Sequence, residues 1–273
     1  MRIAEDREKG KRAVRAAIDA GYTLFDHADI YGDGHCETIF GEVLRESPAL
    51  RDDILIQAKC GVRWNPSRYD LSHDYIVASV EGSLARLGIE NLDLLLLHRP
   101  DYLMNATEVA DAFESLQASG KVAHFGVSNF STSQFDLLQS AVAEPLLINQ
   151  VEINIHNTEA LDNGVLDQCQ RLGITPQAWC PVAGVAYPAW GNTFSDEDTA
   201  RIRTELDRQI KRYNTEDWLI ALAWLLKHPA NISPLVGSTT PDRIRAAVTA
   251  LDIDYSRKDW YRLLEARNGV SVP

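Results

Sequence analysis

The chain has 273 residues, 45% of them apolar and 24% charged, an ordinary balance for a globular protein with a sizeable core. Its 39 acidic and 27 basic residues give a formal net charge of −12, which repels phosphate backbones and anionic lipid surfaces. Nucleic acid and membranes are therefore not expected as partners. The length alone would suit two domains of about 150 residues or one barrel of about 250.

The N-terminus and the cysteines bear on the compartment. The segment MRIAEDREKGKR is charged where a secretion signal needs an apolar stretch, and no run of about 18 apolar residues follows it. We therefore expect a soluble cytoplasmic protein. The cysteines have no CxxC spacing, so we interpret them as small core residues in a reducing cytosol rather than as disulfides or metal ligands. They are Cys36, Cys60, Cys169 and Cys180.

Helices and short apolar strands alternate along the chain. The elements expected first are helix 5–20, strand 23–26, helix 35–47, strand 53–59, an irregular connection over 60–70, a helix capped by Ser72 and ended by Gly88, strand 92–98, helix 105–118 and strand 122–127. Those expected after them are helix 131–141, strand 146–152, helix 158–172, strand 174–179, helices 197–212 and 215–227, strand 232–237, helix 240–250 and a helix from Ser256.

This alternation predicts a parallel α/β fold. Strands such as LDLLLLH are apolar at consecutive positions, which is typical of parallel strands buried on both faces. Right-handed crossovers between such strands, closed into a cylinder, give a TIM-type (β/α)8 barrel, which we predict as a single domain over residues 1–273. No GxGxxG pattern follows a strand, so a Rossmann fold has no support. The strands number seven rather than eight.

Four polar residues stand at or just past the C-terminal ends of these strands, where barrel enzymes place their active sites. Asp26 and Tyr31 lie in FDHADIYG, Lys59 follows ILIQA, and His98 follows LDLLLL. Each has an ordinary structural explanation when taken alone, such as a turn, a helix cap or a core histidine. A lysine inside an apolar strand is harder to explain, because an unpaired buried ammonium costs several kcal/mol.

Together these residue types suit the reduction of a carbonyl group, which needs a proton delivered to oxygen as hydride reaches carbon. A phenol is a poor proton donor at neutral pH unless a neighbour shifts its pKa. An ammonium beside Tyr31 would lower that pKa, and a carboxylate would keep Lys59 charged and in place. An imidazole such as His98 could donate a hydrogen bond to the carbonyl oxygen.

Six segments of the chain resemble the aldo-keto reductase superfamily, in particular its bacterial oxidoreductases of the YdhF type. They are DHADIYG, AKCG, DLLLLHRPD, GKVAHFGVSNF, NQVEIN and VGSTTPDRI, and the resemblance covers nearly the whole chain. It implies an NADP(H)-dependent oxidoreductase that transfers hydride to an aldehyde or ketone. The implied catalytic tetrad is Asp26, Tyr31, Lys59 and His98, with Tyr31 as the general acid.

Polar residues at the remaining strand ends could bind the cofactor. Ser128, Asn129 and Gln150 could hydrogen-bond a carboxamide, and the Trp179 ring could stack on a nicotinamide; the resemblance implies the same four positions. Ser128 and Asn129 could instead cap the helix that begins near residue 131, and Trp179 could be a core residue.

The segment VGSTTPDRI could hold a phosphate, because a helix follows it and free N–H groups at a helix N-terminus attract anions. The resemblance implies that Gly237, Ser238, Thr239 and Arg243 bind the adenosine 2′-phosphate of NADP(H). Many family members have a lysine where this chain has Gly237, so we expect NADP(H) with a weaker preference over NAD(H) than is usual. As an alternative, Arg243 is only a solvated helix residue.

The resemblance also shows what precedes the first helix in the family, namely a hairpin and a first barrel strand. Only Met1 to Ala4 could stand for them here. We therefore expect a gapped barrel, a short makeshift strand at the N-terminus, or a chain that is incomplete relative to the natural gene product. Unpaired strand edges would be the physical consequence of a gap.

Several aromatic residues fall in or near loops on the catalytic side and suit an apolar pocket for a small aldehyde or ketone, but they could equally pack beneath those loops. They are Trp64, Tyr69, Tyr102, Phe130 and Trp190. Two other function classes stay open: a nonenzymatic NADP(H)-binding regulatory subunit of the same fold, and a barrel lyase or hydrolase that forms a Schiff base on Lys59. We expect a monomer or a weak homo-oligomer.

Overall fold

The computed structural model describes residues 6–189, 191 and 194–272, which fall into two compact units. The first unit comprises the described residues up to 150 together with 238–244. The second comprises 151–237 together with the residues from 245 onward. The expectation of one domain over the whole chain stays a prediction.

Parallel strands form the centre of the first unit, in the order β1, β2, β5, β6, β7. Their bounds are β1 (Leu24–Asp26), β2 (Leu55–Cys60), β5 (Leu92–Leu97), β6 (Val122–Ser128) and β7 (Ile148–Glu152), which belongs to this unit up to Gln150. In β5 five of the six residues are buried, as the run of leucines predicts for a strand covered on both faces. The parallel α/β class is confirmed, and parallel order brings the C-terminal ends of these strands to one edge.

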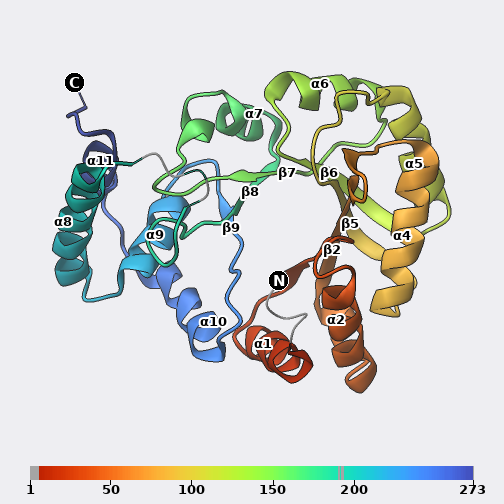
Figure 1. The fold of residues 1–273 in the computed structure, drawn as a ribbon, viewed down its shortest axis with the longest axis horizontal. Helices are drawn as coiled ribbons and strands as arrows, with labels where there is room; N and C mark the ends of the chain where they lie inside the picture. The colour runs from red at the N-terminus through yellow and green to blue at the C-terminus, as the bar shows by residue number, and fades with distance from the viewer. Residues whose placement is uncertain (1–5, 190, 192–193, 273) are drawn as a thin grey trace. The chain divides into compact units, whose positions relative to one another are not determined.

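Helices connect these strands and pack against one another as a layer outside them (Figure 1). They are α1 (Arg7–Asp19), α2 (His35–Glu46), the short α3 (Leu50–Asp53), α4 (His73–Leu87), α5 (Ala106–Ala118) and α6 (Thr132–Ala141). Gly88 ends α4 in the left-handed conformation, with φ 69°. Ser72 occupies the N-cap position as predicted, but its hydroxyl donates to Asp70 Oδ1 at 2.7 Å instead of capping the helix.

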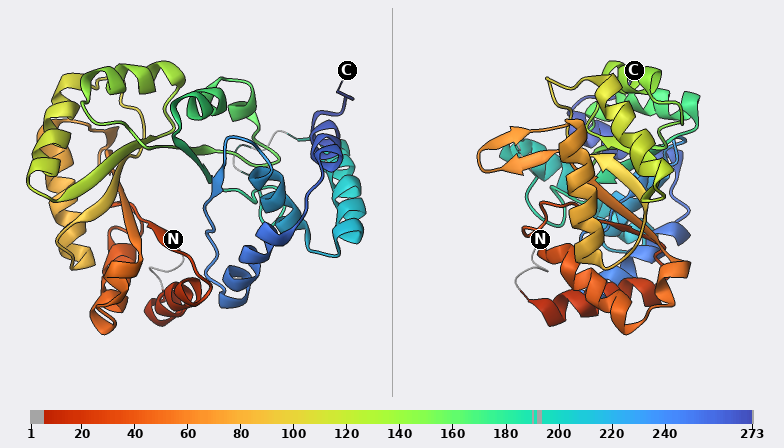
Figure 2. Two further views of the ribbon diagram at one scale, coloured as in Figure 1. Left: turned by 180° about the vertical axis from the view of Figure 1, so that it is seen from behind. Right: turned by 90° about the vertical axis from the view of Figure 1, so that its right-hand side faces the viewer.

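The predicted irregular connection after β2 is in fact a hairpin. Strands β3 (Val62–Trp64) and β4 (Ser67–Tyr69) pair antiparallel and project beyond the strands that they follow (Figure 2, right). The Tyr75 hydroxyl on α4 donates to the Val62 carbonyl at 3.3 Å and anchors its base. The sequence did not reveal the hairpin, because each strand is only three residues long and the proline between them signals a break.

The second unit contains the parallel pair β8 (Thr175–Trp179) and β9 (Ser233–Pro234). Its helices are α7 (Val165–Leu172), α8 (Asp196–Tyr213), α9 (Asp217–Leu226) and α11 (Arg257–Asn268), with short 3₁₀ turns η1 (Glu159–Leu161) and η2 (Val248–Asp252). A helix α10 (Pro241–Ala247) spans the boundary between the units.

Three predicted elements of this region were too long. The helix expected over 158–172 is interrupted by Gly164, whose φ of 84° is left-handed, and the Asn163 side chain caps the turn by accepting from Val165 N at 3.1 Å. The helix expected over 240–250 changes to a 3₁₀ turn at Val248. The strand expected over 232–237 shrinks to two residues, since Pro234 has no N–H to donate to a ladder.

The next observations concern the region before the first helix and the possibility of a membrane span. The makeshift strand predicted for Met1 to Ala4 lies outside the described residues. Within the first unit, β1 stands at one end of the strand order and pairs with β2. No helix in the described part of the chain combines the length and apolarity needed to cross a membrane.

Candidate active site

The four residues predicted to act together are gathered at one edge of the first unit. Asp26 ends β1, Lys59 lies near the end of the neighbouring β2, and His98 follows β5, which pairs with β2. Tyr31 sits in the turn between β1 and α2, a turn held by the hydrogen bond from Asp29 N to the Lys59 carbonyl at 3.1 Å. Strand order therefore places the four side chains together, although they are up to 72 residues apart in sequence.

Lys59 is fully buried and forms an ion pair with Asp26. Its Nζ lies 2.5 Å from Asp26 Oδ2 and donates a second hydrogen bond to the His27 carbonyl at 3.0 Å. Burial alone lowers the pKa of Lys59, but its interactions with Asp26 and Tyr31 outweigh burial, so the pKa lies above its usual value. Lys59 therefore carries a positive charge at neutral pH.

The Tyr31 ring contacts both this cation and His98. Lys59 Nζ is 4.9 Å from the ring centroid, and the Tyr31 and His98 rings meet edge to face with centroids 5.7 Å apart. Burial raises the pKa of the phenol, while the Lys59 charge and hydrogen bond lower it, and burial is the larger effect. The lysine acts in the predicted direction, yet the net pKa is raised and not lowered, so the phenol holds its proton at neutral pH.

His98 is neutral at physiological pH. Burial first, and then the nearby Lys59 charge, lower the pKa of His98 to about 3. A neutral imidazole has one N–H donor and one acceptor nitrogen. Its Nδ1 is buried and has no hydrogen-bond partner among the described residues. His98 can thus donate a hydrogen bond to a carbonyl oxygen without adding a charge to the site.

Two glutamines that flank Asp26 complete its hydrogen bonding. The side-chain amides of Gln57 and Gln150 both donate to Asp26 Oδ1, the latter at 3.2 Å. Sequence reasoning placed Gln150 at the cofactor and missed Gln57 altogether. The signal was available, because Gln57 is a polar residue in the middle of the apolar strand ILIQAKC, two positions before Lys59 and so on the same face.

Ser128, Asn129 and Gln150 form a second polar group joined to the first. The Ser128 hydroxyl donates to the Gln150 carbonyl at 2.8 Å, and the Asn129 amide donates to Ser128 Oγ at 2.8 Å and to the His98 carbonyl at 3.2 Å. The helix-capping alternative fails for both residues, because Ser131 is the N-cap of α6 and forms a capping box with Gln134. Their side chains instead form hydrogen bonds that connect the ends of neighbouring strands.

The other predicted cofactor residues are distributed over both units. Trp179 ends β8 of the second unit and is half-buried. Gly237 is exposed and belongs to the second unit, whereas Ser238, Thr239 and Arg243 belong to the first. Arg243 is exposed near the start of α10. The positions of these residues do not by themselves show that they bind a phosphate, so this role stays a prediction.

The aromatic residues predicted for a substrate pocket differ widely in exposure. Tyr102 is 90% exposed, Trp64 is 63% exposed on the β3–β4 hairpin, and Tyr69 is 41% exposed beside it. Phe130 is only 1% exposed, so it is a core residue, as the alternative of packing beneath the loops predicts. Trp190 lies outside the described residues. The four cysteines, all of them among the described residues, form no disulfide; Cys60 and Cys169 are buried as predicted, Cys36 and Cys180 only partly.

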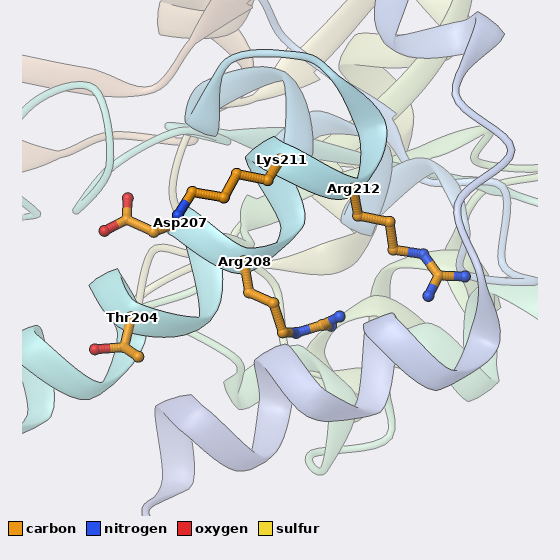
Figure 3. Close-up of a pocket in the computed structure, with 5 residues that line it drawn as sticks. All are labelled: Thr204, Asp207, Arg208, Lys211 and Arg212. Atoms are coloured by element: carbon orange, nitrogen blue, oxygen red, sulfur yellow. The ribbon is translucent and has the colours of Figure 1, made fainter.

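A surface hollow elsewhere lies on one helix of the second unit (Figure 3). Its lining residues all belong to α8 and are Thr204, Asp207, Arg208, Lys211 and Arg212. The two arginines already form ion pairs with the buried Asp259. We therefore assign these cations to the packing of α8 on α11.

The sequence of this chain is similar to those of several known proteins. The sequence profile described as "Aldo/keto reductase family" matches residues 4–268. "Oxidoreductase YdhF" of Escherichia coli is 42% identical over 95% of this chain and 88% of its own length. "6-dehydroglucose reductase" of Agrobacterium fabrum is 39% identical over 99% of this chain and 93% of its own.

A solved structure shows the same similarity in three dimensions. The crystal structure of an aldo/keto reductase from Klebsiella pneumoniae in complex with NADP and acetate matches 94% of this chain and 84% of its own, with a TM-score of 0.79 and 26% identity. A fold of the TIM-barrel type is thus confirmed for the matched region.

Proposed function

Because the chain belongs to the aldo/keto reductase family, we propose that it is an NADP(H)-dependent oxidoreductase that reduces an aldehyde or ketone to the alcohol. The observation that carries the proposal is the buried ion pair of Lys59 and Asp26, placed against the Tyr31 phenol with the neutral His98 beside it. These groups match, one for one, what the proton half of the reaction requires.

Each side chain has a distinct part in that proton transfer. The Tyr31 O–H bond breaks as its proton passes to the carbonyl oxygen, leaving a phenolate that the Lys59 ammonium stabilises at close range. Asp26 holds the ammonium in place through its 2.5 Å contact. The His98 N–H orients the carbonyl oxygen and stabilises the charge that develops on it.

The residues at the strand ends fit a nicotinamide. A carboxamide both donates and accepts hydrogen bonds, and the hydroxyl of Ser128 with the amides of Asn129 and Gln150 offers both kinds of partner. When bound, the nicotinamide supplies the hydride. NADP occupies the Klebsiella pneumoniae aldo/keto reductase, which supports the same cofactor here. We propose that Trp179 stacks on its ring.

For the choice between NADP(H) and NAD(H), we propose that Arg243, with Ser238 and Thr239, contacts the 2′-phosphate. An arginine suits this role because its fork of N–H groups can bind phosphate at two points. Gly237 contributes no charge, so the preference for NADP(H) is expected to be modest. The protonated state of Lys59 argues against the Schiff-base alternative, because a nucleophilic amine must first lose that proton.

The substrate class is a small carbonyl compound. The relative named 6-dehydroglucose reductase makes oxidised sugars the first polar carbonyls to test, beside simple aromatic and aliphatic aldehydes. The exposed Trp64 on the hairpin after β2 is a surface on which an apolar substrate group could pack.

The experiment that tests the function compares the wild type with Tyr31→Phe. NADPH oxidation is followed with the aldehyde panel, and NADPH binding is followed separately by fluorescence titration. Loss of a positioned general acid typically slows a reaction by about 10²- to 10⁴-fold, so the variant should lose most of its kcat and bind NADPH as the wild type does. Tyr261→Phe on α11 is the matched control and should keep full turnover.

Two results would reject the proposal in different ways. Retained turnover in Tyr31→Phe would remove the phenol from its role as the acid. Tight NADPH binding by the wild type without turnover of any carbonyl would favour the nonenzymatic regulatory subunit instead.

A further inference from the structure

We propose that Gln57 is a positioning residue, whose side-chain amide fixes the Asp26 carboxylate and through it the Lys59 ammonium against Tyr31. The inference rests on the proposed function and adds to it a residue outside the predicted tetrad. It is drawn from the hydrogen bonds of the Asp26 carboxylate, in which each oxygen has its own set of donors.

Strand pairing places Gln57 where it can do this. In the parallel register of β1 and β2, Asp26 is the partner of Gln57, and Lys59 lies two residues further along β2 on the same face. The two β2 side chains therefore reach the same carboxylate from one strand. Lys59 Nζ donates to Asp26 Oδ2 at 2.5 Å, and the Gln57 amide donates to Asp26 Oδ1.

Because this position is fully buried, a polar side chain there requires a hydrogen-bond partner. Gln57 is 0% exposed and stands between Ile56 and Ala58, which are equally buried. An unsatisfied buried amide costs free energy, whereas an apolar side chain of similar size would cost none. The amide nitrogen of Gln57 donates to Asp26, so this hydrogen bond is directed at the one carboxylate that the site depends on.

Gln150 cannot replace Gln57 without giving up its other proposed role. Its amide reaches the same Oδ1 from β7 at 3.2 Å, but Gln150 is also a residue proposed to hold the nicotinamide carboxamide. When the cofactor engages Gln150, Gln57 is left as the amide donor that keeps the carboxylate from rotating away from Lys59. Gln57 thus matters most in the loaded protein, where the reaction takes place.

The test replaces Gln57, and separately Gln209, with methionine, which is nearly the same size as glutamine. Gln57→Met removes the amide, and because hydrogen bonds to charged groups are the strong ones, kcat should fall by about tenfold to a hundredfold while Kd for NADPH changes little. Gln209→Met is the matched control. Gln209 is also 0% exposed, and its amide donates to Glu205 and to the Asp259 carbonyl, so its loss should lower stability without changing kcat.

Gln57→Glu adds a readout that a purely structural role would not give. A protonated glutamic acid can donate its O–H to Asp26, but an ionised glutamate can only accept and would repel that carboxylate. Its kcat relative to the wild type should therefore approach one at acid pH and fall as pH rises. The titratable groups that act on or with Asp26 are His27, Tyr31, Lys59 and His98. They are common to both proteins, so the ratio reports the new carboxyl group at residue 57 together with the effect of its charge on them.

A second measurement does not depend on turnover. In protein labelled with ¹⁵N-lysine, the Lys59 ammonium signal is assigned by its loss in Lys59→Met. It should shift in Gln57→Met, and it should shift with pH in Gln57→Glu, but stay at the wild-type position in Gln209→Met. An unchanged Lys59 signal in both Gln57 variants would overturn the inference even if the wild type reduces no carbonyl. Unchanged kcat in Gln57→Met would overturn it in an active enzyme.

Discussion

Replacing Lys59 with methionine tests the ion pair directly, and the structure sets the size of the effect. At an effective dielectric constant of about 20, two unit charges 2.5 Å apart attract by about 7 kcal/mol, most of which offsets the cost of burying both ions. Removing one partner of a buried pair usually costs about 3 to 5 kcal/mol. Asp26 keeps 15% of its side chain exposed and retains the amide donors Gln57 and Gln150, so we expect about 3 kcal/mol.

The assay is a double-mutant cycle in urea with Lys59→Met, Asp26→Asn and the double variant. Asp26→Asn should cost at least as much as Lys59→Met, because it leaves a fully buried ammonium without its counterion. The double variant should cost about 2 kcal/mol less than the two single variants together, since no charge is then left unpaired. Strictly additive costs would refute the coupling. Because the chain forms two compact units, circular dichroism and tryptophan fluorescence must show coincident transitions before free energies are compared.

Two further predictions concern pH and cofactor choice. Reduction needs the protonated phenol, so kcat should stay level through neutral pH and fall only in alkali as pH rises through the raised pKa of Tyr31; a step between about pH 5 and 8 that disappears in His98→Asn would contradict the neutral imidazole. Arg243→Ala should raise Kd for NADPH by about tenfold and leave Kd for NADH nearly unchanged, whereas Gly237→Lys, whose new Cβ meets open space, should strengthen NADPH binding alone.

The strands of the site were predictable from sequence because burial on both faces gives a signal that needs no partner. Runs such as LDLLLL identify a buried parallel strand by themselves, and a polar residue at the end of such a run marks the edge where sites form. Lys59 and His98 are predictable on this basis, whereas β1, which ends at Asp26, is short and only half-buried. The structure shows that these side chains share one edge.

Features that depend on pairing between segments were not predictable in the same way. The role of Gln57 follows from its register against Asp26, which no single strand encodes. The β3–β4 hairpin depends on closing two three-residue strands around a proline, and its base is fixed by Tyr75 from a later helix. From the sequence alone, Ser128 and Asn129 could equally cap the helix that follows them, but in the structure Ser131 is its N-cap.

The Tyr31 phenol shows most clearly where a residue pattern stops being informative. A pattern gives the sign of each influence: a neighbouring ammonium lowers the pKa of a phenol, and burial raises it. It does not give their balance, because desolvation depends on how completely several segments cover the ring. Here burial prevails in the free protein, so Lys59 does not make Tyr31 a phenolate at rest. The ammonium then stabilises the phenolate mainly as the proton leaves, and an interaction that strengthens toward the transition state is the kind that raises kcat.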